Sequence, residues 1–224
     1  MNKWHITIIF VLAATLLLAV SCNKDDGELY PSILTSTATL WADAEGYATF
    51  LVVDNDSTYN ALYAVDKDGN ETAISGLPAG DGVRVICNYE QQPDGRVRIY
   101  GISSLANLRD CSSLDTLKHN PLTVVSVWKG GGFVNMHLKP KSAGGLHSWG
   151  FLRDSVRTNV LGGQTHYISL FHDQKDDPFS YSRDVYACIG FDTLATVRTA
   201  KDSFELAIHT FDGVRRFRFT SPSE

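Results

Sequence analysis

The sequence predicts an all-β protein whose mature chain forms two β units. Short runs rich in β-branched and aromatic residues recur along the chain, and compositions typical of turns separate them. No long amphipathic helical pattern interrupts these runs. The predicted mature chain has 224 − 21 = 203 residues, which suits one large β domain or two small ones. We predict two, because residues 102–117 are the least β-like stretch and separate two series of strands.

The first unit is predicted over residues 34–112 as a small barrel. Its early turns, at residues 43–46 and 54–57, are rich in Asp, Asn, Gly and Ser. Asp68-Gly69 predicts a hairpin, because glycine readily adopts a positive φ. The strands are expected at residues 35–42, 47–54, 61–66, 71–74, 83–89 and 96–100, and their close spacing is typical of a small barrel.

The second unit is predicted over residues 113–221. Asn120-Pro121 restarts the chain in an extended conformation, because the residue before a proline is disfavoured in a helix. Residues 133–138 alternate between two faces, as a strand requires, and residues 129–132 form a glycine-rich turn before them. The other strands are expected at residues 122–128, 147–153, 165–172, 183–191, 203–210 and 214–220.

The N-terminus reads as an export signal over residues 1–21. Lys3 precedes an apolar run of 15 residues from Ile6 to Val20, which is shorter than the roughly 20 residues that span a bilayer. The run ends at Ala19-Val20-Ser21-Cys22, which resembles a bacterial lipobox. We therefore expect acyl chains, palmitate among them, on Cys22 and anchoring in a membrane through this lipid. The alternative is an ordinary signal peptide followed by an incidental cysteine.

Residues 22–33 are predicted to form an acidic tether. Lys24, Asp25 and Asp26 follow the lipid-bearing cysteine in a pattern similar to the surface-export signal of Bacteroidota lipoproteins. The pattern predicts an outer-membrane protein on the cell surface, with the periplasmic face as the alternative. A solvated acidic linker would have the same composition.

The charge balance excludes one class of partner. Removing the signal leaves 19 − 25 = −6 charges, and nonspecific nucleic-acid binding needs clustered Lys and Arg. The basic cluster of Arg215, Arg216 and Arg218 alternates with Phe217 and Phe219, which indicates a strand with one solvated face. We expect no nucleic-acid partner.

Three cysteines remain beside Cys22, so at most one disulfide can form within the chain. Cys87 and Cys111 are the nearest pair and the candidate disulfide. A bridge there would stabilise the fold by about 3 kcal/mol if the geometry permits. Cys188 lies in an apolar run and is expected to be buried.

Four histidines on predicted strands are candidates for a metal site: His137, His147, His166 and His172. If their strands are neighbours the side chains could converge, as zinc ligands do, but no metal-site spacing is present. Buried strand histidines that bond a neighbour are commoner. Asp173, Asp176 and Asp177 form an acidic cluster that is interpreted as a solvated turn. The sequence therefore predicts no cofactor.

No pattern indicates an enzyme. The chain lacks a Gly-x-Ser-x-Gly motif, a phosphate-binding glycine loop and any nucleophile with a recognisable base. We expect a protein without catalytic residues.

Several blocks, in their order, resemble the NigD-like family of Bacteroidota lipoproteins. They are Cys22 with the acids that come after it, Gly80-Asp81-Gly82-Val83-Arg84-Val85 opening a strand that ends at Tyr89, and the segment from Asn120 through Trp128-Lys129-Gly130-Gly131-Gly132-Phe133-Val134-Asn135-Met136. Leu146-His147 and Leu170-Phe171-His172-Asp173 are similar to later family positions. The resemblance implies an N-terminal OB-like barrel and a C-terminal antiparallel β-sandwich, over nearly the whole mature chain.

The family takes its name from a bacteriocin-associated operon, so the resemblance implies an immunity-like or bacteriocin-associated role. The leading expectation is a non-enzymatic outer-membrane lipoprotein that binds a protein or glycan partner. Two alternatives are an envelope metal-binding protein or enzyme that uses the strand histidines, and a structural envelope component.

Overall fold

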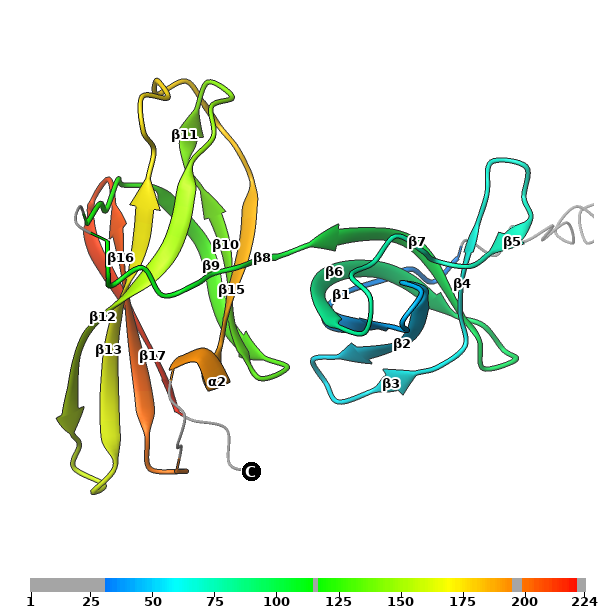
Figure 1. Ribbon diagram of the computed structural model, residues 1–224, viewed down its shortest axis with the longest axis horizontal. Helices are drawn as coiled ribbons and strands as arrows, with labels where there is room; N and C mark the ends of the chain where they lie inside the picture. The colour runs from blue at the N-terminus through cyan, green and yellow to red at the C-terminus, as the bar shows by residue number, and fades with distance from the viewer. Residues whose placement is uncertain (1–30, 115–116, 195–198, 221–224) are drawn as a thin grey trace, which may run out of the picture. The chain divides into compact units, whose positions relative to one another are not determined.

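The computed structural model describes residues 31–114, 117–194 and 199–220, and residues 33–224 group as one compact unit. The predicted signal peptide, Cys22, and the Lys24, Asp25 and Asp26 signal lie outside the described residues. The described chain is built almost wholly of strands, with one short helix, α2 (Phe191–Leu194) (Figure 1). Within this described part, no helix is long and apolar enough to cross a bilayer.

The first unit is one seven-stranded sheet that curls into a half-barrel (Figure 1). Its strand order is β3-β2-β1-β6-β7-β4-β5, and all neighbours are antiparallel except β4 and β7. This confirms the predicted small β unit. The strands are β1 (Leu34–Ala42), β2 (Ala48–Val53), β3 (Thr58–Tyr59), β4 (Leu62–Val65), β5 (Glu71–Thr72), β6 (Gly82–Gln91) and β7 (Val97–Ser104).

Alternation along the strands builds the core of this sheet. In β6, Val85, Cys87 and Tyr89 are buried, whereas Asn88 between them is exposed. The register shifts between Asn88 and Tyr89 where β6 pairs with β7, and such a bulge increases local twist and helps a sheet to curl. Further core residues come from β1, β2 and β7, among them Leu40, Leu51 and Ile99.

The second unit is a β-sandwich of two four-stranded sheets, ordered β8-β15-β10-β9 and β12-β13-β16-β17, with a small β11-β14 ribbon. Residues of both sheets share one apolar core that includes Met136, Phe151, Ile189 and Phe204. The strands are β8 (Ala106–Asn107), β9 (Thr123–Gly130), β10 (Phe133–Lys139), β11 (Lys141–Ser142), β12 (Ser148–Thr158), β13 (Gln164–Asp173), β14 (Tyr181–Ser182), β15 (Val185–Gly190), β16 (Ser203–Thr210) and β17 (Gly213–Thr220).

The sandwich is mainly antiparallel, as predicted, with two exceptions. β13 pairs with β16 in parallel, and β15 pairs with β8 in parallel. Because parallel neighbours require a crossover rather than a hairpin, these pairings leave no local turn signal in the sequence.

The boundary between the two units lies earlier than the predicted one. β8 joins the sheet of the sandwich, and Leu108 packs into its core. Residues 106–112, which the sequence assigned to the barrel, therefore lie with the sandwich. A two-residue strand is too short for its alternation to be recognised, which explains the difference.

The predicted Cys87–Cys111 disulfide is wrong, and Cys87, Cys111 and Cys188 are all free thiols. Cys87 is fully buried in the core of the first sheet. Cys111 belongs to the segment bonded to β12, where its backbone N–H donates to the carbonyl of Phe151 at 2.8 Å. The cysteine nearest in sequence is therefore held in a different β unit.

Arg84 of β6 is a buried charge with several partners. Its guanidinium forms an ion pair with Asp54 at 2.5 Å, and its Nε donates to the Asn135 side-chain oxygen at 3.2 Å. Arg84 is 4% exposed, and its ion pair is part of a hydrogen-bonded group, as a buried charge requires. Both Arg84 and Asn135 stand in the sequence blocks that carry the family resemblance.

Candidate binding surface

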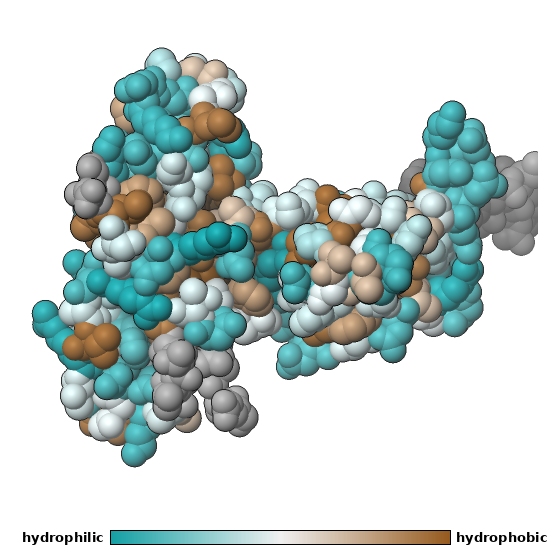
Figure 2. Space-filling model, in the orientation of Figure 1, coloured by the Kyte–Doolittle hydropathy of each residue, from teal (hydrophilic) through white to brown (hydrophobic). Residues whose placement is uncertain are grey.

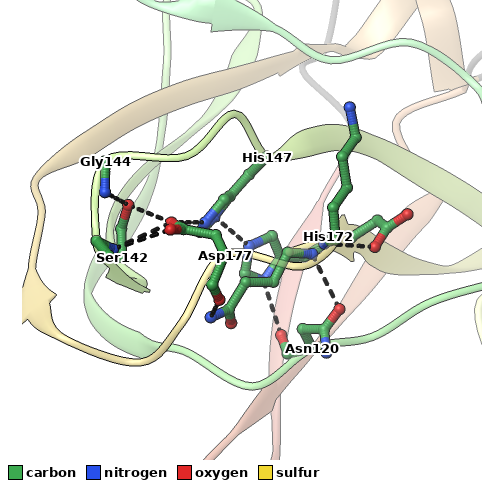
Figure 3. Close-up of polar contacts among 10 residues, drawn as sticks. Asn120, Ser142, Gly144, His147, His172 and Asp177 are labelled. Atoms are coloured by element: carbon green, nitrogen blue, oxygen red, sulfur yellow. Dashed lines mark hydrogen bonds and ion pairs between the residues drawn. The ribbon is translucent and has the colours of Figure 1, made fainter.

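A buried polar network lies at one end of the sandwich (Figure 3). His172, at the end of β13, is 1% exposed. Its Nδ1 lies 2.8 Å from the backbone oxygen of Asn120, and its Nε2 lies 2.9 Å from Nδ1 of His147. His147 Nε2 lies 2.9 Å from a carboxylate oxygen of Asp177. The network thus joins three chain segments, and the Trp149 ring stacks on His172 at 4.1 Å between ring centroids.

The hydrogen bonds indicate where the protons of the network lie. His172 Nδ1 faces a carbonyl, which only accepts, so this nitrogen donates. His147 Nε2 faces a carboxylate and also donates. One further hydrogen lies between the two rings. All four ring nitrogens of the two histidines therefore have a hydrogen-bond partner inside the protein.

The pKa shifts describe two members of the network, His172 and Asp177. Burial lowers the pKa of His172 to about 4, although its bond to Asn120 acts in the opposite direction. The hydrogen bond from Ser142 is the largest cause that lowers the pKa of Asp177 to about 2, and the bond to His147 adds to it. Near neutral pH, His172 is therefore neutral and Asp177 is ionised.

Asp177 fastens two loops to each other. Ser142 Oγ donates to its carboxylate at 2.6 Å, and the backbone N–H of Ala143 donates at 3.1 Å. Gln174 donates from its side chain to the backbone oxygen of Asp177 at 2.6 Å. A Cβ at position 145 would lie 2.7 Å from the Asp177 side chain, so the close approach requires the glycine found there. The loop after β11 and the loop after β13 are consequently held in one arrangement.

Exposed apolar side chains lie on these two loops and on the neighbouring turn between β16 and β17. We call them the loop cluster: Leu146, Phe179, Tyr181 and Phe211. Their exposed fractions are 81%, 60%, 56% and 48%, in that order. The rings of Phe179 and Phe211 meet edge to face at 6.0 Å, which links the turn between β16 and β17 to the other loops. Figure 2 shows hydrophobic side chains among hydrophilic ones at the end of the sandwich that carries β11. Gathered apolar side chains on a surface are typical of interaction sites.

A groove of about 530 Å³ lies beside the loop cluster. Aromatic rings and polar groups from the start of β12, the start of β15 and the segment that enters β8 line it together. Its lining residues are Ser103, Ser104, Leu105, Ala106, Pro140, Ser142, Leu146, His147, Trp149, Arg183, Asp184, Val185 and Tyr186.

Only two of the four candidate histidines come together. His147 and His172 are hydrogen bonded to each other, whereas His137 pairs with Asp184 at 2.5 Å and stacks on Tyr186. His166 stacks on Phe204 in the same unit. Among residues 31–114, 117–194 and 199–220, no group of three or more His, Cys, Asp or Glu side chains is arranged to hold a metal ion.

Sequence reasoning missed the role of Asp177. It was interpreted as part of a solvated turn, but its side chain is 5% exposed and accepts bonds from both loops. Asp176 and Lys175 beside it are exposed, as a turn predicts. No local signal separates Asp177 from its neighbours, because its partners Ser142 and His147 lie 35 and 30 residues away.

Comparisons with solved structures find the same fold. A NigD-like immunity protein from Bacteroides caccae is 27% identical, with a TM-score of 0.63 over 86% of this chain and 99% of that chain. A putative toxin-related protein from Parabacteroides distasonis is 12% identical, with a TM-score of 0.64 over 86% and 95% of the chains. A Bacteroides vulgatus protein of unknown function is 12% identical, with a TM-score of 0.61 over 85% and 92%. At 12% identity, the similarities to the Parabacteroides distasonis and Bacteroides vulgatus proteins show a shared fold and nothing more.

No curated protein sequence matches the chain. The model of the NigD-like C-terminal beta sandwich domain matches residues 106–220, which is more than half of the sequence. The match begins at β8, where the sandwich begins in the structure. The two all-β units and this match together establish that the chain belongs to the NigD-like family.

Proposed function

We propose that this protein is a non-enzymatic lipoprotein of the outer membrane that binds a protein partner through the loop cluster, in an immunity-like role. One observation carries the proposal: the large apolar side chains of the loop cluster are exposed on loops that the buried polar network holds in place. Exposed aromatic residues on preorganised loops bind with little loss of conformational freedom. The related Bacteroides caccae protein, described as an immunity protein, supports the immunity-like role.

The geometry of the network favours binding over catalysis. The Asp177 carboxylate and both nitrogens of His147 and His172 are engaged with one another or with the backbone. The neighbouring hydroxyl, that of Ser142, donates to Asp177 rather than to a histidine that could act as its base. The polar groups of this network bond to one another and to the backbone, and these bonds hold the loops in position.

The envelope location rests on the N-terminal pattern. Cys22 would carry the lipid, and Lys24, Asp25 and Asp26 would direct the protein to the cell surface. Cell fractionation tests the anchor: Cys22→Ala should leave the membrane fraction, and a variant that stays there would contradict lipid attachment. Protease treatment of intact cells tests the face of the membrane, because protection from cleavage would place the protein on the periplasmic side.

Photo-crosslinking in the native host tests the loop cluster. A photoreactive amino acid would replace Phe179, and a matched control would replace Leu161, an exposed apolar residue on the β12–β13 hairpin (64% exposed, against 60% for Phe179). We expect a discrete protein adduct from position 179 that is absent from position 161. Adducts that contain only glycan would favour a glycan partner instead. Equal adducts from both positions, or none, would favour a structural envelope component.

A further inference from the structure

The groove beside the loop cluster has features of a small-ligand site. Its volume of about 530 Å³ falls within the range of about 300–1,000 Å³ typical of such sites. Leu146 belongs both to the loop cluster and to the groove lining, so the groove adjoins the surface proposed for the protein partner. Titration of the isolated chain with a small ligand tests the groove without that partner.

Two aromatic rings in the groove are each supported by a stacked histidine. Trp149 stacks on His172 at 4.1 Å with an interplanar angle of 13°. Tyr186 stacks on His137 at 4.3 Å with an angle of 17°. Each histidine is in turn held by another group, His172 by Asn120 and His137 by Asp184. Both rings line the same groove, so it contains two aromatic surfaces whose orientation is set before any ligand arrives.

Arg183 supplies a cation at this groove. Its backbone N–H donates to Pro140 at 3.1 Å, which fixes the position of the residue. Its guanidinium has no hydrogen-bond or ion-pair partner within the described part of the chain, and the residue is exposed. The adjacent Asp184 is instead engaged by His137 at 2.5 Å and by Lys139 at 3.4 Å. The guanidinium is therefore available to a carboxylate, which it can bind with two parallel hydrogen bonds.

Hydroxyl groups and acceptors complete the lining. Ser103 and Ser104 are exposed, and neither hydroxyl has a side-chain partner among the residues that the structure describes. The second carboxylate oxygen of Asp184 can accept from a ligand hydroxyl. Neighbouring donors and acceptors of this kind match the vicinal hydroxyls of a sugar, and flat aromatic rings match the C–H face of a sugar ring.

We propose that the groove binds a carboxylated sugar of the uronic-acid type. The carboxylate pairs with Arg183, the apolar face of the sugar ring packs on Trp149 or Tyr186, and ring hydroxyls bond to Ser103, Ser104 and Asp184. An acidic peptide would satisfy Arg183 equally well, but it would bring no polyhydroxylated edge to the serine side of the groove. We therefore favour the sugar.

NMR titration of the mature chain with D-glucuronate tests the proposal. We expect a change in the indole N–H signal of Trp149, assigned with a Trp149→Phe variant. D-glucose has the sugar hydroxyls without the carboxylate, and acetate has the carboxylate without the sugar ring. Each should therefore bind about tenfold more weakly than glucuronate.

Arg183→Gln should lower the affinity of the protein for glucuronate about tenfold. The matched control Arg157→Gln, an exposed arginine on β12 outside the groove lining, should leave the affinity unchanged.

Three other results would contradict the proposal, either in part or as a whole. Glucose binding as tightly as glucuronate would remove the role of Arg183. Acetate or N-acetyl-aspartate binding as tightly would remove the sugar and favour an acidic peptide. Titration without any change at Trp149, or Arg183→Gln binding like the unmodified protein while its spectrum remains folded, would show that this groove is not the site.

Discussion

His147 and Asp177 form a buried hydrogen-bonded pair in which the ring Nε2 lies 2.9 Å from the carboxylate oxygen, and each side chain is only 5% exposed. The pair links the segment that enters β12 to the loop that leaves β13. Because these loops display Leu146 and Phe179, the pair connects the stability of the sandwich to the shape of its proposed binding surface.

Replacing the carboxylate should loosen this end of the sandwich. Asp177→Asn replaces a carboxylate that accepts from His147, Ser142 and the backbone N–H of Ala143 by an amide, which is a weaker acceptor and turns an NH₂ group toward these donors. We expect thermal unfolding several degrees lower, and faster hydrogen exchange at the backbone amide of Ala143, which donates to the Asp177 carboxylate. Asp176→Asn is the matched control, since Asp176 is exposed in the same loop. Equal effects of the two substitutions would contradict the role assigned to the pair.

Mild acid should destabilise the protein through His172. Its folded-state pKa of about 4 lies below the ordinary 6.5, so between these values the unfolded chain binds more protons than the folded chain. The free energy of unfolding should therefore fall as the pH falls from about 6.5 to about 4, by roughly 3 kcal/mol if the whole shift is expressed. Urea unfolding across this range measures it. A His172→Gln variant should have a flatter pH profile, and a steep profile in that variant would assign the effect elsewhere.

Arg84 should be one of the most costly positions to change. Arg84→Met removes the cation from Asp54 and a donor from Asn135, while Asp54 stays largely buried at 16% side-chain exposure. Breaking a buried ion pair costs about 3–5 kcal/mol, and urea unfolding should record a loss of this order. Arg98→Met on the neighbouring strand β7 is the control, because this arginine packs over Tyr100 and is only partly buried. A loss no larger than that of the control would show that the Arg84 contacts contribute little.

Thiol titration checks the correction to the disulfide. A Cys22→Ser chain, denatured without reductant, should expose three thiols, whereas a Cys87–Cys111 bridge would leave one. In the native state labelling of Cys87 and Cys188 should be slow, because burial raises the pKa of both thiols to about 11 and so suppresses the reactive thiolate. The same titration after reduction provides the reference count.

The strands that sequence analysis placed best have strong alternation and clear turn signals. Residues 133–138 were predicted as a strand, and β10 spans Phe133–Lys139. Residues 203–210 coincide with β16. Strands of two residues, such as β3 and β8, went unrecognised, because two positions hold too little of the pattern. The same limit moved the boundary between the units away from the one predicted.

The candidate site was only partly predictable. His147 and His172 are two of the four candidate histidines and stand in blocks similar to later family positions, but no pattern indicated that these two, and not His137 and His166, would be hydrogen bonded to each other. What distinguishes them is the pairing of β12 with β13, which sets Trp149 opposite His172 and brings the neighbouring His147 within reach of it. Asp177 was assigned to solvent because its neighbours are acidic and turn-forming, whereas its burial depends on where the β11 loop lies.

The sequence by itself determined the all-β character, the division into two units and the family resemblance, since these depend on local alternation, turn composition and ordered motifs. Only the tertiary structure decided which polar residues are buried together, which aromatic rings share a groove and that the cysteines stay unpaired. The physical reason is that these side-chain contacts join residues 25 to 35 positions apart, as in the His172–His147 and Ser142–Asp177 hydrogen bonds. Contacts over such separations are set by the register of the sheets, which no single segment encodes.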